Sequence, residues 1–381
     1  ANENGINIIM FDKSKSADGK TSRIYAGVSQ SKADNIYYSD DAGESWNVLP
    51  ASEEASQRYM PQRFDLDSKG DLFVSYGNKE GPWNSVQGTL YKYNADNGTG
   101  EEIQVISWTV GDIVIDPNND DNMVLVTSEV WKEQPNGAFG DKFYRTTDGG
   151  KTWSDITNSP EEGKVLYKGK VALTADGSAL IWSPSNGSFT YRTEDWGQTW
   201  EKCDGIAGSQ SVYLIGDPVN KDYVYGCCNS IVFVSSDGGK TFKRKYDTMS
   251  KYKRLAVAPD TEGTFYVPGG GSGLIMTTDY GENFTLVPGL KFCDAVGLGK
   301  PKNDGNPYVI YVSGTPKEEG AVKGIYMTED NGENWVRVND DLHRFGGTGN
   351  GEFISGDMNV YGRCYMSTVG LGIAYCDKNE K

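Results

Sequence analysis

The sequence predicts an all-β protein, a single β-propeller of about eight four-stranded antiparallel blades, with seven blades as the alternative. Two observations support this prediction: an acidic octapeptide that recurs along the chain, and short strand-like runs between its copies. The octapeptide has the form Ser/Thr-x-Asp-x-Gly-x-Thr-aromatic, as in "TTDGGKTW", and its Asp lies at positions 41, 148, 195, 237, 279 and 330. The copies are 107, 47, 42, 42 and 51 residues apart, so the first interval is about twice the others. A period of roughly 40–50 residues is typical of propellers and solenoids.

The octapeptide has the chemistry of a tight turn. Its carboxylate and hydroxyl can accept hydrogen bonds from backbone N–H groups, its Gly can adopt backbone angles that other residues resist, and its final aromatic ring can anchor the turn between sheets. It resembles the Asp-box found on propeller blades of sialidase-like and related proteins. A catalytic role is the alternative, but six equivalent copies cannot share one active site, so we interpret the carboxylates as structural. They are Asp41, Asp148, Asp195, Asp237, Asp279 and Asp330.

The stretches between the octapeptides consist of short alternating runs separated by turns, which is the pattern of antiparallel blade strands. A second blade that lacks the octapeptide accounts for the long first interval, and the last blade supplies three strands. We assign the whole chain, 1–381, to one propeller domain. The blades are predicted at residues 6–50, 60–108, 110–157, 165–204, 210–246, 252–289, 293–339 and 351–377.

Composition narrows the choice of partners. The formal charge is −16 and the pI is near 4.6, which argues against nucleic acid and anionic membranes and suits a neutral polysaccharide. No run approaches the roughly 18 apolar residues of a membrane span. The six cysteines form no CxxC pair and the single His343 cannot complete a His-based metal site, so we expect neither a metal nor another cofactor. We expect a monomer.

Two further features concern the compartment in which the protein works. Cys364 and Cys376 lie on predicted neighbouring strands of the last blade. They could form a disulfide there or stay as two free thiols, and the sequence leaves both alternatives open. Sequons at Asn97, Asn186 and Asn283 fit secretion from a glycosylating host. The chain begins "ANENGINIIMFD" with no signal peptide visible, so we expect a secreted protein in its mature form.

Several longer stretches are more specific than a propeller signal. They resemble, in order along the chain, the xyloglucanases and the oligoxyloglucan reducing-end-specific cellobiohydrolases. The stretches are "RIYAGVSQSKADNIYYSDDAGESW", "DLFVSYGNKEGPWNSVQGTLYKYN", "VALTADGSALIWSPSNG", "VPGGGSGLIMTTDYGENF" and, within Arg337–Asp377, "RVNDDLHRFGG" and "ISGDMNVYGRCYMSTVGLGIAYCD". The resemblance implies two propellers that face each other across an open cleft. It also implies inverting hydrolysis of the β-1,4-glucan backbone of xyloglucan by one Asp from each propeller.

The chain departs from this family in the residues for catalysis. The family places its base in a phrase like Ala-Arg-Thr-Asp-x-Gly-Gly and its acid in one like Asp-Tyr-Ala-Glu-Leu, and neither phrase occurs here. Blades resembling the first propeller run directly into blades resembling the second near residues 153–173. We therefore predict a secreted propeller that binds xyloglucan in a cleft with little or no hydrolysis, its catalytic residues unknown. An active inverting endo-β-1,4-glucanase with unidentified Asp or Glu residues, and a non-catalytic protein-interaction propeller, stay open as alternatives.

We expect aromatic side chains in or near two inserted loops to bind the sugar. The loops Gly77–Gly88 and Ser128–Asp141 lie between predicted strands, where propellers place function, and the matching loops of the family line the cleft. An indole can stack on the apolar face of a sugar. Each candidate also has a structural interpretation as a core or edge residue, above all the one at position 182, which lies in a strand-like run. The candidates are Trp131, Trp83, Tyr76 and Trp182.

Overall fold

The fold is an all-β propeller of eight blades, which confirms the fold class and favours eight blades over seven. The computed structural model describes residues 6–17, 20–28, 30, 33–49, 60–77, 88–106, 109–128, 143–155, 170–184, 189–207, 212–248, 254–343, 353–368 and 373–377. Within these ranges one 3-10 turn, η1 (Lys13–Lys15), accompanies the strands. The residues divide into two compact units, Ala1–Gln210 and Ser211–Lys381, and each unit holds four blades.

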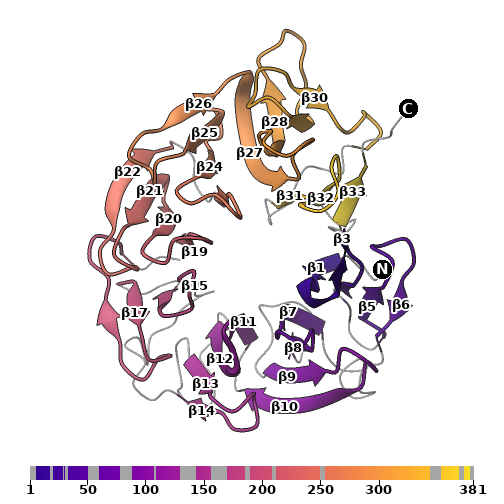
Figure 1. The fold of residues 1–381 in the computed structure, drawn as a ribbon, viewed down its shortest axis with the longest axis vertical. Helices are drawn as coiled ribbons and strands as arrows, with labels where there is room; N and C mark the ends of the chain where they lie inside the picture. The colour runs from indigo at the N-terminus through magenta and orange to yellow at the C-terminus, as the bar shows by residue number, and fades with distance from the viewer. Residues whose placement is uncertain are drawn as a thin grey trace. The chain divides into compact units, whose positions relative to one another are not determined.

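Each blade of the first unit is a four-stranded antiparallel sheet whose strands follow the chain order (Figure 1). Blade 1 holds β1 (Ile6–Phe11), β4 (Ile24–Val28), β5 (Ile36–Ser39) and β6 (Asn47–Val48), with a small hairpin of β2 (Ser16–Ala17) and β3 (Lys20–Thr21) inserted after β1. Blade 2 holds β7 (Met60–Leu66), β8 (Leu72–Gly77), β9 (Gly88–Tyr93) and β10 (Gly100–Ile106). Blade 3 holds β11 (Thr109–Asp116), β12 (Asn119–Ser128), β13 (Phe143–Thr146) and β14 (Ser154–Asp155). Blade 4 holds β15 (Lys170–Leu173), β16 (Leu180–Ser183), β17 (Tyr191–Thr193) and β18 (Glu201–Lys202).

The second unit follows the same plan, and its last sheet has three described strands. Blade 5 holds β19 (Tyr213–Gly216), β20 (Val224–Cys228), β21 (Ile231–Ser235) and β22 (Lys243–Asp247). Blade 6 holds β23 (Ala256–Val257), β24 (Phe265–Pro268), β25 (Leu274–Thr277) and β26 (Thr285–Val287). Blade 7 holds β27 (Leu290–Gly299), β28 (Val309–Pro316), β29 (Gly324–Thr328) and β30 (Val336–Arg337), and blade 8 holds β31 (Ile354–Gly356), β32 (Cys364–Ser367) and β33 (Ile373–Cys376). The assignment of 1–381 to one domain stays a prediction.

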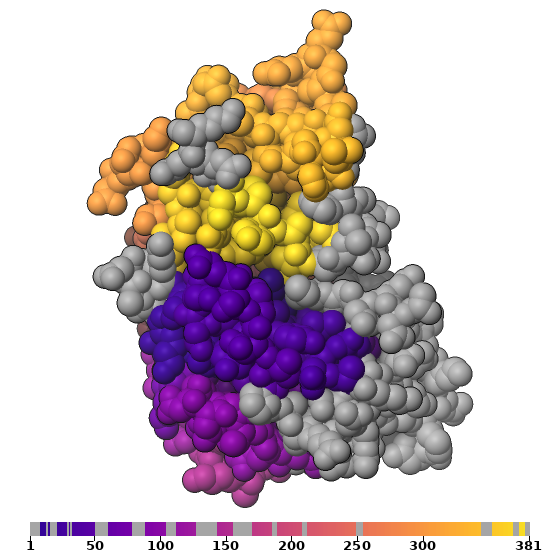
Figure 2. Space-filling view, turned by 90° about the vertical axis from the view of Figure 1, so that its right-hand side faces the viewer, coloured from indigo at the N-terminus to yellow at the C-terminus, as the bar shows by residue number. Residues whose placement is uncertain are grey.

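The apolar cores lie between neighbouring blades of a unit. β7 contacts β1 and β4 on one side and β11 on the other, and Figure 2 shows the indigo residues of blade 1 against the purple ones that follow them in the chain. β8 and β28 are buried along their whole length, because neighbouring blades cover both faces of these sheets. Strands covered on both faces do not alternate between apolar and polar residues, so their sequence cannot show which side chains reach solvent.

The two ends of a blade carry different connections. In blade 3, Thr109 at the start of β11 lies opposite Ser128 at the end of β12. The connection 129–142 leaves from this end, which we call the loop end. At the other end, Ile115 of β11 pairs with Met123 of β12. Met123 also lies opposite Thr146, the first residue of an octapeptide. We call this the box end. Because blade 2 pairs in the same way, the predicted sugar loops and the octapeptides lie at opposite ends of the blades.

Candidate functional site

The octapeptide folds into a hydrogen-bonded turn at the box end of its blade. In blade 1 the Asp41 carboxylate accepts hydrogen bonds from the Ser39 hydroxyl at 2.7 Å and from the Ser45 N–H at 2.8 Å. The Ser39 oxygen accepts one from the Gly43 N–H at 2.8 Å. Gly43 has a φ of 97°, in the region that favours glycine, so the turn explains why this position lacks a side chain.

The other five copies repeat these hydrogen bonds. Oδ1 of each Asp accepts from the Ser or Thr hydroxyl two residues before it at 2.7–2.8 Å, and from the N–H four residues after it at 2.8–2.9 Å. Hydrogen bonds from Ser45 lower the pKa of Asp41 to about 2, and those from Thr152 lower the pKa of Asp148 to about 2. The pKa of the other four is lowered too, because such hydrogen bonds outweigh burial. Carboxylates held in this way stay ionised and are unsuited to donate a proton to a substrate.

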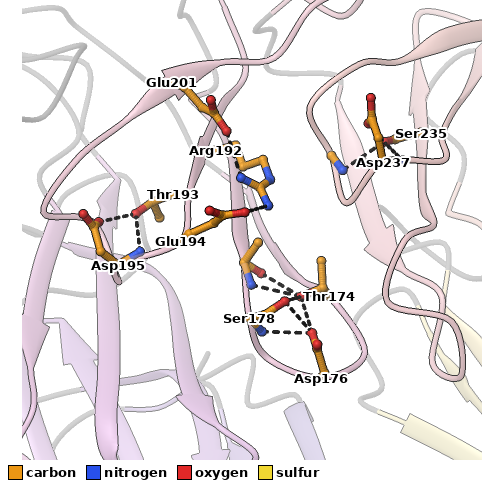
Figure 3. Close-up of polar contacts among 12 residues, drawn as sticks. Thr174, Asp176, Ser178, Arg192, Thr193, Glu194, Asp195, Glu201, Ser235 and Asp237 are labelled. Atoms are coloured by element: carbon orange, nitrogen blue, oxygen red, sulfur yellow. Dashed lines mark hydrogen bonds and ion pairs between the residues drawn. The ribbon is translucent and has the colours of Figure 1, made fainter.

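The ion pairs of blade 4 are structural as well. Figure 3 shows the Arg192 side chain beside Glu194 and Glu201, close to the octapeptide turn of Asp195. The buried Arg192 guanidinium pairs with Glu194 at 2.5 Å and with Glu201 at 2.8 Å. Since both carboxylates already engage it, this arginine joins β17 to β18 and does not serve to bind an anionic substrate.

The aromatic ring that closes the octapeptide is buried or partly buried in five copies. Phe242 is buried. The rings that pack against the cores of neighbouring blades are Trp153, Trp200, Phe284 and Trp335. Trp46 differs, because 42% of its surface is exposed although its Nε1–H donates to a backbone carbonyl of its own turn at 3.1 Å. The expectation that each closing ring is anchored between sheets is therefore wrong for blade 1.

Two of the four predicted sugar-binding aromatics lie in the core. The Tyr76 and Tyr93 hydroxyls are joined by a hydrogen bond of 2.8 Å, and burial raises the pKa of both phenols. Trp182 packs against aromatic rings of blades 3 and 4. Tyr76 and Trp182 are each 0% exposed, so neither offers a face to a sugar in this conformation. Trp131 and Trp83 lie outside the described residues, as do most of the two loops that contain them.

An acidic cavity of about 600 Å³ lies near the box ends of blades 1, 2 and 3. Five aspartates and no described Lys or Arg line it, which favours cationic over anionic ligands. These aspartates are Asp12, Asp65, Asp67, Asp116 and Asp120. Several serve the fold: the Asp120 carboxylate accepts hydrogen bonds from the N–H and the hydroxyl of Ser68 at 2.9 and 2.5 Å, and Lys92 lies 3.6 Å from Asp67.

Asp65 and Asp112 join neighbouring blades through side chain–backbone hydrogen bonds. Asp65 on β7 accepts the N–H of Ile115 on β11 at 2.9 Å, and Asp112 on β11 accepts the N–H of Val171 on β15 at 3.4 Å. Burial, with a smaller contribution from the charge of Asp112, raises the pKa of Asp65 to about 7. Burial also raises the pKa of Asp112, and the positive charge of Lys170 opposes this rise. Asp65 therefore exchanges a proton near neutral pH, as a general acid or base must.

Neither Asp65 nor Asp112 was predicted from the sequence as a site residue. Asp112 interrupts the mostly apolar run "GDIVID", and a charged residue within such a run is the signal that could have shown it. Asp65 lies in "RFDLD", where Arg63 and Asp67 are also charged, so the same signal is missing there. Their hydrogen-bond partners lie 50 and 59 residues further along the chain. Local patterns do not indicate such distant contacts.

Within the described ranges no group of three or more His, Cys, Asp or Glu side chains is arranged to hold a metal ion. The same part of the chain contains no helix with the length and apolar character of a membrane span.

The sequence and the structure of this chain were compared with those of known proteins. The BNR/Asp-box repeat family matches residues 37–48 and 144–155, the turns of Asp41 and Asp148. The chain is 23% identical to a xyloglucanase from Paenibacillus sp, over 99% of this chain and 54% of that protein. It is 29% identical to a probable oligoxyloglucan-reducing end-specific xyloglucanase from Neosartorya fischeri, over 61% of this chain and 31% of that protein.

The chain thus spans about half the length of the first relative and about a third of the second. Among solved structures, a GH74 enzyme from Niastella koreensis is 25% identical with a TM-score of 0.51, over 99% of this chain and 75% of that one. The repeated turns, the eight blades and these matches all indicate the same kind of protein. The chain is an Asp-box β-propeller similar to the xyloglucanases.

Proposed function

We propose that this chain binds the β-1,4-glucan backbone of xyloglucan at the loop ends of its blades and leaves that backbone uncut. One observation carries the proposal. The match to the Paenibacillus xyloglucanase runs over 570 positions, whereas this chain has 381 residues. The relative therefore contains, within the matched region, many residues without a counterpart here. Both catalytic phrases that the resemblance implies are also missing from the chain.

The described carboxylates support binding without hydrolysis. Inverting hydrolysis needs a carboxylic acid and a carboxylate base roughly 6.5–9.5 Å apart with room for one water molecule. The six octapeptide carboxylates are engaged by their own turns, at the box ends of the blades. Asp65 and Asp112 accept N–H groups of the next blade. A ligand at the loop ends would therefore meet none of the octapeptide carboxylates.

Trp131 and Trp83 supply the stacking surface in this proposal, since both belong to loops that leave the loop ends. An indole covers the apolar face of a glucose ring while the rim hydroxyls keep their hydrogen bonds. We also propose that the protein works outside the cell, because its polymeric ligand cannot cross a membrane.

Affinity electrophoresis in gels containing tamarind xyloglucan tests the binding surface. We expect retardation of the wild-type protein and a loss of affinity of about tenfold or more in Trp131→Ala, because one stacked ring contributes on the order of 1 kcal/mol or above. Trp46→Ala is the matched control: it removes an exposed Trp from a box end, and its affinity should equal that of the wild type. An unretarded wild-type band would instead favour the alternative of a protein-interaction propeller, and equal affinity in Trp131→Ala would reject that platform.

Hydrolysis is the second candidate function, and one observation favours it. Asp65 lines the acidic cavity and has a pKa of about 7, a value that suits a general acid at neutral pH. If the protein releases reducing ends from xyloglucan and Asp65→Asn abolishes this release while xyloglucan binding persists, hydrolysis replaces our proposal. If neither protein releases reducing ends, the proposal of binding alone stands.

A further inference from the structure

Two cysteine side chains of blade 8 face each other across neighbouring strands. Cys364 on β32 and Cys376 on β33 are direct partners in the antiparallel register, as the sequence prediction of neighbouring strands required. Their Sγ atoms lie 3.6 Å apart without a bond. Directly opposed antiparallel residues have Cα separations of roughly 4.5–5.5 Å, within the range of about 4.4–6.8 Å found in disulfides. Small side-chain rotations would therefore suffice to form the bond.

A cavity of about 400 Å³ gives access to this pair. Both thiols line it, together with His343, Asp340 and Arg337 from the end of blade 7. Asp340 lies 2.7 Å from the His343 imidazole, so polar groups surround one side of the cavity. Figure 2 shows the yellow residues of the last blade at the molecular surface. A small molecule can therefore approach the sulfur atoms without unfolding of the blade.

The two thiols differ in exposure and acidity. Cys364 is 3% exposed, whereas Cys376 is partly exposed near the end of the last strand. The two sulfur atoms lie within reach of an S–H···S hydrogen bond in which either thiol can be the donor. This interaction lowers the pKa of the Cys376 thiol, while the same interaction and burial raise the pKa of the Cys364 thiol. Since the thiolate is the reacting species, Cys376 is the attacking group and Cys364 the resolving one.

We infer that Cys364 and Cys376 form a reversible dithiol–disulfide couple, a covalent site that exchanges with small organic disulfides through this cavity. The Cys376 thiolate attacks one sulfur of the small disulfide, forms a mixed disulfide and releases the first small thiolate. Cys364 then loses its proton and attacks Cys376 Sγ, which forms the Cys364–Cys376 bond and releases the second small thiolate. The two protein thiols are oxidised, and one small disulfide is reduced to two thiols.

The bond would fix the last described strand of the chain. β33 pairs with β32 alone among the described strands, and a cross-link restricts the freedom of the strand to separate. We therefore expect slower amide hydrogen exchange in β33 after oxidation.

The test treats the folded wild-type protein with bis(2-hydroxyethyl) disulfide, a reagent small enough for the cavity. Remaining thiols are then alkylated under denaturing conditions and the peptides are analysed by mass spectrometry. We expect Cys364 and Cys376 to lose alkylation together and to appear in one disulfide-linked species that a phosphine reductant reverses. Cys203, Cys227, Cys228 and Cys293 are the internal controls, since all four are buried, and they should stay alkylatable.

Alkylation of both cysteines after treatment, or a stable mixed disulfide on Cys376 in the wild type, would overturn the inference. Two variants distinguish the roles. In Cys364→Ser the mixed disulfide on Cys376 should accumulate, because the resolving thiol is gone. In Cys376→Ser the reaction at Cys364 should be slower by about tenfold or more, because its thiolate is the scarcer species. Equal rates in both variants would contradict the assigned order of attack, and the wild-type result decides the inference if a variant does not fold.

Discussion

Replacing Asp65 with Asn should change how the stability of this protein depends on pH. Asp65 is partly buried between blades 2 and 3, and its carboxylate accepts the N–H groups of Leu66 and Ile115 at 2.9 Å each. Burial nevertheless raises its pKa to about 7, against about 3.9 in an unfolded chain. Asn has the same shape and cannot ionise, so the variant lacks this titration. Its amide nitrogen cannot accept one of the two N–H groups, and this loss does not depend on pH.

The sign follows from proton binding. Between about pH 4 and pH 7 the folded protein keeps a proton on Asp65 that the unfolded chain has lost, so the free energy of unfolding falls as the pH rises through this window. One unit of pKa corresponds to about 1.4 kcal/mol, and about two units of the window lie above pH 5. Allowing for partial solvent access, we expect a change of about 2–3 kcal/mol between pH 5 and pH 8.

Urea unfolding of the wild type and Asp65→Asn from pH 5 to pH 8 measures this change. The stability of the wild type relative to the variant should decrease by about 2–3 kcal/mol across the range, because other titrating groups cancel in the comparison. Asp148→Asn is the control: its carboxyl pKa is lowered to about 2, so its difference from the wild type should stay constant over the same pH range. A constant difference for Asp65→Asn as well would refute a neutral pKa at this position.

Two further predictions concern blade packing and modification. Gly297→Ala should lower the free energy of unfolding by about 2 kcal/mol or more, because its Cβ would lie 2.4 Å from the Ile354 carbonyl oxygen of blade 8. Gly271→Ala is the control, since there is open space around its Cβ. Its free energy of unfolding should stay within about 0.5 kcal/mol of the wild-type value in the same urea titration. In a glycosylating host, glycopeptide mass spectrometry should find a glycan on Asn97, which lies at an exposed hairpin tip, but not on Asn283. The Asn283 Nδ2 already donates a hydrogen bond to the Asp279 carboxylate at 2.7 Å. Modification of both residues, or of neither, would contradict this distinction.

The repeated turns were accessible from the sequence because each one is local. All six octapeptides contain their own donors and acceptors within eight residues. Their spacing and the strand-like runs between them predicted the propeller, and their turn chemistry predicted the structural role of Asp41 and its equivalents. The positions of Cys364 and Cys376 on adjacent strands followed from the same regularity. Each of these predictions needed only the order of short strands and turns along the chain.

The candidate site was less accessible because it depends on contacts between blades. Tyr76 and Trp182 occupy strands covered on both faces, where alternation does not separate core from surface. Asp65 and Asp112 gain their properties from the next blade, through partners 50 and 59 residues away. Trp131 remains a prediction, since it lies in a loop outside the described residues.

The release of reducing ends from tamarind xyloglucan by the purified protein shows directly whether this chain cuts the polymer or only binds it. We predict that the polymer retains the protein and that this release does not exceed that of a heat-inactivated sample. Release that grows in proportion to protein concentration would contradict it, because a cutting pair of carboxylates would then operate in this propeller.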